Sequence, residues 1–567
     1  MTAKTLLKRS VAVLLILLPL FTFYGYFFKY MLNIPVNDDY PAVLQWLNIY
    51  VNTHGIGPKL KLLFAQHNEH RIVFSRIWTL LSYKLQGNVN FNFLSFVGDL
   101  SLIGMGWIFF RKFRELRKSL FLFIPVTVIL FNLTSWENMT FAMCALSNFV
   151  VHFFILLTLA CLTAPTAENK RNVLLGVLFF GASLYTQGGG LSLYPVSIGI
   201  LLYKKEYKNA WLYGSLATLL VLFYFLGYQR PPQVTDLWTV LRDFKVRSIV
   251  FYFAFLGNSF DYFLIFTNEV EQSIGITAII GFGFFLLYIY ITRQKYWRRN
   301  LFIYSVLSLV IITGLMTAIS RSPMGLYVAG ASRYRINGLI FLIGLYFWFI
   351  DTYKIEAKRP MLAILVITGW YYVVINYSQY EYLCVRQEQM YEEAWTFRMG
   401  DSSIVNPNPE ETERQRETLK RSDSLNIYHL PDMAQIDAYF PHSTLEPASD
   451  GPDNSSLEMS KSIHLVHRIG PDYMIDGMGF LQWKSAEHQK LYVGIKNQTD
   501  STPVFYSTVP VLRFDQNPYF HKWNLLKSGF RARINADAIK PGENTVWIKV
   551  ETGGQIKTEQ TDSKFIK

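Results

Sequence analysis

The chain has 567 residues, of which 51% are hydrophobic and only 17% are charged. Because soluble domains carry about a quarter charged residues, this composition excludes an ordinary soluble protein over most of the length. The formal net charge is +13, but the basic residues stand in short clusters between apolar runs. That pattern indicates the positive-inside bias of a membrane protein and argues against a nucleic-acid partner.

Long apolar runs occupy the chain up to residue 380, and a helix needs about 20 such residues to cross a bilayer. The first run is too long for a signal peptide and lacks a cleavage site, so it is predicted to be a retained helix. About eleven spans are predicted, at 10–30, 89–110, 119–135, 141–163, 172–186, 190–203, 209–227, 274–292, 301–319, 337–350 and 361–380.

The loops between these spans alternate in charge. Every second loop is short and basic, from Arg111-Lys112 to Lys358-Arg359, and these loops are predicted to be cytoplasmic. The N-terminus is then inside, while the long loops 31–88 and 228–273 and the C-terminal tail lie outside. We therefore expect a multi-pass protein of the bacterial inner (plasma) membrane with a periplasmic tail.

An acidic motif, Asn37-Asp38-Asp39-Tyr40, follows the first span. Two adjacent carboxylates at a membrane exit can bind a metal, or one of them can serve as a base near the reacting groups. The alternative is a solvated turn, since Asn and Asp favour turns.

A second polar motif, Gln66-His67-Asn68-Glu69-His70-Arg71, lies in the same loop. It opens the amphipathic segment 72–85, which is predicted to be an interfacial helix. On a helix, His67 and His70 would face the same way and could ligate a metal with Asp38 or Asp39. The alternative is a polar cap on that helix.

Further polar groups flank the outer ends of later spans. Arg321, Arg333 and Arg335 run against the positive-inside bias, and guanidinium groups bind phosphate bidentately. The alternative is ion pairing with the acidic loop or with lipid headgroups. Two more segments complete this face, Trp136-Glu137-Asn138 and Gln187-Gly188-Gly189-Gly190. Either segment could bind a ligand. The alternatives are an interfacial aromatic anchor for the first segment and a tight hairpin between helices for the second.

The tail changes character after residue 380. Residues 381–460 are predicted to form a helical and irregular linker, since polar, turn-rich sequence follows a helix start near Pro409. Residues 461–567 contain short alternating runs such as 491–495 and 546–550, separated by Gly, Pro, Asn and Asp. The predicted fold is therefore an α-helical polytopic domain, 1–380, followed by a linker and a β-sandwich-like domain.

Together, Asp38-Asp39 after the first helix, the interfacial segment from Arg71 and the sandwich-like tail resemble the GT-C superfamily of integral-membrane glycosyltransferases. More particularly, Gln66 to Arg71 with Ser332-Arg333-Tyr334 looks like a group of bacterial membrane proteins that are classed with the glycosyltransferases without a substrate.

This resemblance implies transfer of a sugar from a polyprenyl-phosphate donor to a glycan, lipid or protein acceptor, with inversion, at the periplasmic face. Asp38 or Asp39 would be the general base, and cations or a bound divalent cation would stabilise the leaving phosphate. The implied substrate-binding residues are Arg71, Arg321, Arg333, Tyr334, Arg335, Glu137 and Gln187, and the implied metal ligands are His67, Glu69 and His70. The other acidic metal motifs of the superfamily have no clear counterpart, which leaves metal dependence open.

Two other functions are compatible with a polytopic chain. A transporter or flippase for a lipid-linked sugar would need polar residues through the membrane midplane and usually two similar halves. A non-catalytic envelope protein would use its β-domain to bind a glycan or a partner, but it would leave the clustering of Asp, His and Arg at one face unexplained.

Overall fold

The structure is a computed structural model, and it describes residues 3–165, 170–231, 235–260, 270–353, 355, 358–399, 409–446, 453, 456–513 and 525–567. The chain divides into two compact units. Unit 1 comprises Met1–Gln387 and Glu417–His429, and unit 2 comprises Glu388–Arg416 and Leu430–Lys567.

The predicted linker, 381–460, is divided between these units. Residues 417–429 belong to unit 1 because their polar groups bond to the first loop. Asn48 donates to the Ser422 hydroxyl at 3.0 Å, and the Tyr428 hydroxyl donates to the carbonyl of Asn33 at 2.7 Å. Polarity along the sequence predicts a linker there, whereas the side-chain contacts make the segment part of the helical unit.

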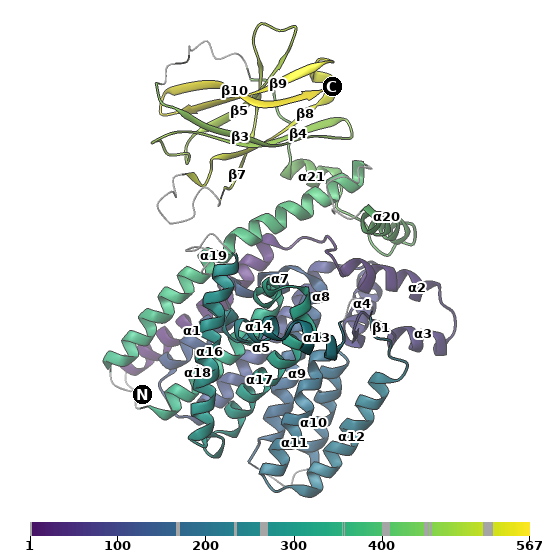
Figure 1. Cartoon of the computed structure of the whole chain (residues 1–567), viewed down its shortest axis with the longest axis vertical. Coiled ribbons are helices and arrows are strands. Elements are labelled where there is room, and N and C mark those ends of the chain that lie inside the picture. The colour runs from purple at the N-terminus through teal and green to yellow at the C-terminus, as the bar shows by residue number, and fades with distance from the viewer. Residues whose placement is uncertain are drawn as a thin grey trace. The chain divides into compact units, whose positions relative to one another are not determined.

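Eight helices in the described residues are long and apolar enough to cross a membrane (Figure 1). They cover Leu6–Tyr30, Phe91–Glu115, Leu120–Thr140, Ala142–Leu162, Ser273–Arg293, Leu301–Met324, Ser332–Thr352 and Arg359–Met399. The helices at the three other predicted spans are α10 (Lys170–Leu184), α11 (Leu193–Tyr203) and α12 (Tyr207–Phe225). The first two are short and the third is less apolar, so the prediction of about eleven spans is confirmed only in part.

Shorter elements of unit 1 connect these helices. In chain order the unit contains α1 (Ala3–Tyr30), η1 (Tyr40–Gln45), α2 (Trp46–Asn52), α3 (Ile56–Leu63), β1 (Gln66–His67), β2 (His70–Arg71), α4 (Val73–Gln86), α5 (Phe91–Glu115), α6 (Ile124–Leu130), α7 (Trp136–Thr140), α8 (Ala142–Cys144), η4 (Ala145–Phe149), α9 (Val150–Leu162), α10, η5 (Gly188–Ser192), α11, α12, α13 (Leu237–Asp243), α14 (Lys245–Gly257), α16 (Val270–Arg293), α17 (Leu301–Arg321), η10 (Ser332–Tyr334) and α18 (Arg335–Thr352). Helix α19 (Lys358–Met399) begins in unit 1 and ends in unit 2.

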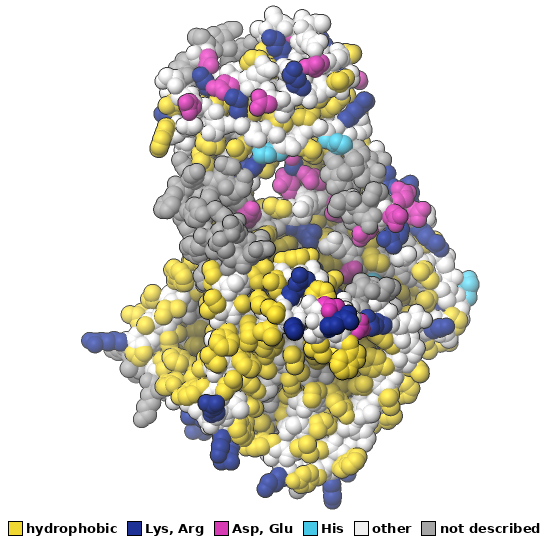
Figure 2. Space-filling model, in the orientation of Figure 1, with side chains coloured by type: hydrophobic (Ala, Val, Ile, Leu, Met, Phe, Trp, Pro, Cys, Tyr) yellow, Lys and Arg dark blue, Asp and Glu magenta, His cyan; other side chains and the backbone are white. Residues whose placement is uncertain are grey.

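The surface of unit 1 fits a hydrocarbon environment. Figure 2 shows hydrophobic side chains over much of the visible face of the helices. Large apolar side chains that are more than half exposed include Leu14, Phe21, Trp211, Ile279 and Ile367. Such a continuous apolar surface is costly in water, so unit 1 is a membrane-embedded bundle.

Unit 2 contains two four-stranded antiparallel sheets. One has the order β10-β9-β5-β6 and the other β3-β4-β8-β7. The strands are β3 (Met459–Ile469), β4 (Asp472–Leu481), β5 (Lys490–Asn497), β6 (Val504–Ser507), β7 (Val509–Val511), β8 (Gly529–Asn535), β9 (Glu543–Thr552) and β10 (Gln555–Ile566). Ile475 and Phe530 of one sheet share a buried core with Val493 and Ile548 of the other, which gives the predicted sandwich.

Arginine side chains attach the end of α19 to this sandwich within unit 2. Arg531 on β8 bonds to both oxygens of Asp476 at 2.6 Å and to Glu388 and Glu392 of α19 at 2.8 and 2.7 Å. Arg533 bonds to the buried Asp472 at 2.7 Å. Buried guanidinium groups need such multiple partners because an uncompensated buried charge costs several kcal/mol.

Candidate functional site

The polar motif of residues 66–71 folds as a tight β-hairpin. β1 and β2 pair antiparallel, with Gln66 opposite Arg71 and His67 opposite His70. Asn68 in the turn has φ of +47°, a left-handed conformation that Asn adopts more easily than most residues. The prediction that His67 and His70 lie on a helix is therefore wrong, and the helix begins after the motif, at Val73. As a cross-strand pair, the two imidazoles still share one face.

Arg71 anchors this hairpin to other loops of unit 1. Its Nε and Nη2 donate to the carbonyls of Tyr224 and Leu226, each at 2.6 Å, and its Nη1 donates to the carbonyl of Phe64. Only 9% of the residue is exposed. The predicted phosphate-binding guanidinium is thus occupied by main-chain carbonyls, and the arrangement gives Arg71 a positioning role.

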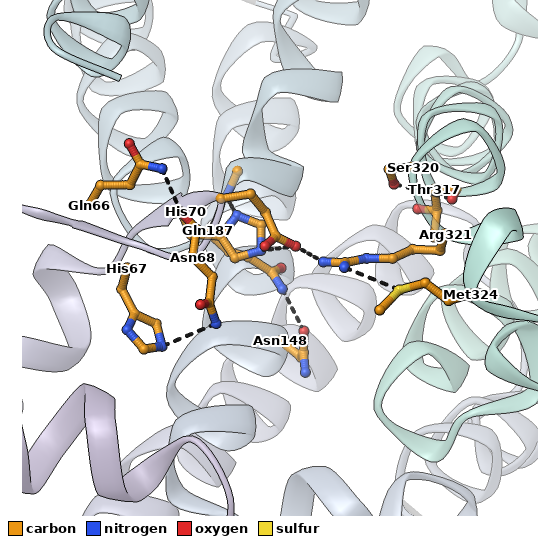
Figure 3. A network of polar contacts seen from close by, with 12 residues as sticks. Gln66, His67, Asn68, His70, Asn148, Gln187, Thr317, Ser320, Arg321 and Met324 are labelled. Atoms are coloured by element: carbon orange, nitrogen blue, oxygen red, sulfur yellow. Dashed lines mark hydrogen bonds and ion pairs between the residues drawn. The ribbon is translucent and has the colours of Figure 1, made fainter. Parts of the chain in front are cut away.

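Glu69 at the tip of the hairpin forms an ion pair with Arg321, at the end of α17 (Figure 3). The Nε2 atom of His70 lies 3.6 Å from the Glu69 carboxylate, and its Nδ1 accepts from the Gly188 amide at 3.3 Å. Burial lowers the pKa of His70 to about 4, and the Asp38 carboxylate opposes this shift. His70 is therefore neutral at neutral pH, with the proton on Nε2 facing Glu69.

His67 lies opposite His70 in the hairpin. Burial lowers its pKa, the Asp38 carboxylate opposes the shift, and Arg76 and His70 add to it. Within the described ranges, no three His, Cys, Asp or Glu side chains are arranged to hold a metal ion. The metal-binding role of His67, Glu69 and His70 stays a prediction.

A chain of amide side chains runs from Gln187 to the Arg333 segment. Gln187 donates to the Asn148 carbonyl oxygen at 2.8 Å, and Asn148 donates to that of Asn138 at 2.9 Å. Asn138 then donates to the main-chain carbonyl of Arg333 at 3.2 Å. Figure 3 shows Gln187 and Asn148 beside the hairpin residues, so this chain joins the hairpin side of the site to the arginine side.

Arg333 and Glu137 form the second ion pair of the site. Arg333 Nη1 lies 2.8 Å from one Glu137 oxygen, and the Arg333 amide donates to the other at 3.2 Å. Glu137 is buried, whereas the Arg333 side chain remains 39% exposed above the ring of Tyr334. The pairing leaves an accessible guanidinium edge that can still contact an anion.

Arg335 does not reach this group. It is buried, and it donates to the carbonyl of Gly330 at 2.8 Å and to the side chain of Gln379 at 2.7 Å. The two arginines, two residues apart in the sequence, therefore have different partners. The turn of η10 directs Arg333 toward Glu137 and Arg335 toward α19.

The two aspartates of the acidic motif differ in environment. Asp39 is 1% exposed and accepts from the amides of Val36 at 3.1 Å and Met143 at 2.9 Å. Burial raises the pKa of Asp39 to about 8, against the effect of these hydrogen bonds. Asp38 is exposed and acts electrostatically on both His67 and His70. Of the pair, Asp38 is the carboxylate that an incoming molecule can reach.

Cys144 places the acidic motif near the second ion pair. Its side chain interacts electrostatically with Glu137, Arg333, Asp38 and Asp39. Residues 38–39 and 333 are far apart in the sequence, yet all of them act electrostatically on this one side chain. The structure thus brings together most of the predicted site residues, with Arg71 and Arg335 held by protein groups instead.

Arg386 belongs to this group and carries no recognisable signal in the sequence. Its guanidinium lies 5.8 Å from the Trp136 ring centre, and Trp136 stacks on Tyr382 at 5.4 Å. Its Nε is buried and has no hydrogen-bond partner in the described part of the chain, and it interacts with Asp39. The sequence places Arg386 in the predicted linker, so only the path of α19 reveals it.

No protein-family model matches this chain, and no curated protein or solved structure matches it either.

Proposed function

We propose that this protein is a membrane glycosyltransferase that moves a sugar from a polyprenyl-phosphate donor to an acceptor, at the periplasmic face of the inner membrane. The observation that carries the proposal is the grouping of an accessible carboxylate, Asp38, with the cations Arg333 and Arg386 on a membrane-embedded bundle. Such a grouping suits a reaction that removes a proton from one group while another group leaves as an anion.

Asp38 is the general base in this proposal. Its carboxylate accepts the proton of the acceptor hydroxyl as that oxygen forms a bond to the anomeric carbon. The bond between the anomeric carbon and the phosphate oxygen breaks at the same time, and its electron pair stays on the lipid phosphate. One displacement from the opposite face inverts the anomeric configuration.

Arg386 and Arg333 bind the leaving phosphate. The buried Nε of Arg386 needs an acceptor, and a phosphate oxygen supplies one through a charge-assisted hydrogen bond. Arg333 keeps an exposed edge while Glu137 fixes its orientation. Because the phosphate gains negative charge as the bond breaks, these cations stabilise the transition state more than the ground state.

The neighbouring Asp39 holds the turn that carries Asp38. Asp39 accepts from the amides of Val36, just before the turn, and of Met143 on α8, and neutral His67 and His70 interact electrostatically with Asp38. A divalent cation at His67, Glu69 and His70 would supply additional charge for the phosphate. The proposal specifies the chemical class of each substrate. The acceptor is a hydroxyl-bearing component of the envelope, and the donor is a lipid-linked sugar.

The test is transfer of radiolabelled sugar from a polyprenyl phosphate by the full-length protein in lipid. Asp38→Asn keeps the shape of the side chain but removes the base, so we expect loss of transfer with the fold retained. Asp243→Asn, which changes an exposed carboxylate of α13 paired with Arg242, serves as the matched control and should transfer normally. Normal transfer by Asp38→Asn would refute the assignment.

A second measurement on the same samples distinguishes a transporter from the proposed transferase. If the intact lipid-linked sugar crosses the bilayer of a vesicle without release of free polyprenyl phosphate, the protein is a flippase and the transferase proposal fails.

A further inference from the structure

Helix α5 carries three polar side chains along one stripe. Asn92, Ser95 and Asp99 are spaced i, i+3 and i+7, so they lie on the same face of the helix over about 10 Å. The helix is one of the eight that can cross a membrane. Polar residues at such positions are costly, and an ionisable one is a functional site by default.

The oxygens of this stripe lack protein partners. Asp99 and Ser95 are both 0% exposed. Both carboxylate oxygens of Asp99, the hydroxyl of Ser95 and the amide oxygen of Asn92 are buried without a hydrogen bond to any described residue. Buried polar groups normally have a partner, and where protein supplies none, water or a bound ion does.

The surroundings of Asp99 supply no counter-charge. No described residue forms a hydrogen bond or an ion pair with the Asp99 carboxylate. The Tyr24 hydroxyl of α1 interacts electrostatically with the carboxyl, but its hydrogen bond goes to the Asp99 main-chain carbonyl, at 3.0 Å. On the η4 side, Gly98 packs directly against the backbone of Ala145, so no charged side chain fits between. An isolated ionised carboxylate in such a place costs many kcal/mol, and binding a proton removes that cost.

We infer that Asp99 is a proton-binding site within the membrane bundle, reached by water along Asn92 and Ser95. The stripe begins at the N-terminal end of α5, where the Phe91 amide donates to Asn33 of the first loop at 2.7 Å. Protons therefore enter from the side of the bundle that carries the 31–39 loop. None of these residues takes part in the proposed transfer reaction, so the inference stands independently of it.

The test is infrared spectroscopy of the full-length protein in lipid at neutral pH. We expect a protonated-carboxyl band that disappears in Asp99→Asn and persists in Asp351→Asn, a control at a carboxylate paired with Arg299. Asp39→Asn is recorded in parallel because a second buried carboxyl can contribute to the same band. Should Asp99→Asn fold poorly, Asp99→Glu must shift the band rather than remove it.

The access path is tested by exchange into heavy water. Ser95→Leu fills the middle of the stripe, so the isotope shift of the Asp99 band should become slower than in the unchanged protein. A spectrum that Asp99→Asn leaves unaltered would show that Asp99 is ionised and would overturn the inference. A thermal midpoint that rises with sodium in the unchanged protein but not in Asp99→Asn would identify Na⁺ as the ligand and would also overturn it.

Discussion

Asp38 and Asp39 are neighbours in the chain, but the Asp39 carboxyl is buried and the Asp38 carboxyl is exposed. Asp39 turns into the protein, where two amides bind it, and Asp38 remains open to water and to the two histidines. The difference separates a buried acid from an accessible one. It also makes the buried member a measurable contributor to stability.

The contribution of Asp39 to the unfolding free energy should fall as pH rises from about 4 to about 8. Folding raises the pKa of Asp39 from 3.8 to about 8, so in this window the native state binds more protons than the unfolded state. The slope from this group is at most about 1.4 kcal/mol per pH unit. Burial of His70 makes the unfolding free energy rise with pH between about pH 4 and pH 6.5. This effect is the same in the unchanged protein and in a variant at Asp39, so it cancels when the two are compared.

Asp39→Asn isolates the effect. The thermal midpoint of the unchanged protein should decline relative to that of Asp39→Asn as the pH is raised through this window. Parallel pH profiles for the two proteins would contradict a raised pKa at Asp39.

In the proposed reaction, replacement of Arg386 should weaken binding of the lipid phosphate. Losing one charge-assisted hydrogen bond of about 1.5–3 kcal/mol raises the KM for the donor by about one to two orders of magnitude. Arg386→Lys keeps the charge but loses the planar guanidinium that lies over the Trp136 ring, so its KM should be intermediate between those of Arg386→Ala and the unchanged protein.

Steady-state transfer at varied donor concentration measures this effect. Arg242→Ala, at an exposed arginine paired with Asp243, is the control and should leave the KM unchanged. An Arg386→Ala protein with normal donor KM would remove Arg386 from the phosphate site.

At the scale of elements, the 66–71 hairpin is positioned by partners from elsewhere in unit 1. Arg71 joins it to the segments that end α3 and α12, and Glu69 joins it to the end of α17. The paired strands are only two residues long, so these side-chain contacts, rather than the ladder, fix the hairpin.

Arg71→Ala should therefore destabilise unit 1 by about 3 kcal/mol or more, because three carbonyls lose a charged donor. Arg71→Lys should restore only part of this loss, since an ammonium cannot reproduce the planar fork. Thermal unfolding in detergent measures both variants, with exposed Lys84→Ala as control. Equal midpoints for Arg71→Ala and Lys84→Ala would show that the anchor is dispensable.

At the scale of the whole molecule, the chain combines two units that are stabilised by different solvents. Unit 1 exposes apolar side chains over its helices, while unit 2 buries an apolar core between two sheets. Damage to the sandwich core should therefore remain within unit 2.

Phe530→Ala tests this separation. Phe530 is 0% exposed in the sandwich core, so its truncation should cost about 3–5 kcal/mol. Hydrogen exchange of the full-length protein should accelerate in β4, β8 and β9 and remain unchanged in the helices of unit 1. Val504→Ala, at a side chain that is 43% exposed, is the mild control. Accelerated exchange throughout unit 1 would mean that the two units unfold together.

The local sequence was sufficient for elements whose formation depends on composition and period. The span predicted at 141–163 corresponds to the helix Ala142–Leu162, and the runs at 491–495 and 546–550 lie within β5 and β9. Hydropathy and the alternation of apolar and polar residues depend on whether each side of a segment contacts water, lipid or protein. They therefore identify these elements without knowledge of the neighbouring elements. They failed at residues 66–71, because a turn at Asn68 depends on one left-handed residue and on contacts to distant loops.

The sequence by itself determined that this is a membrane-embedded helical chain with a β-rich C-terminal domain, and it identified most of the polar groups at the candidate site. Only the tertiary structure decided which of these groups act together. It paired Arg321 with Glu69 and Arg333 with Glu137, tied Arg71 and Arg335 to protein acceptors, and brought Arg386 within electrostatic range of Asp39. The physical reason is that charge interactions fall with distance in space, which spacing along a chain does not reveal.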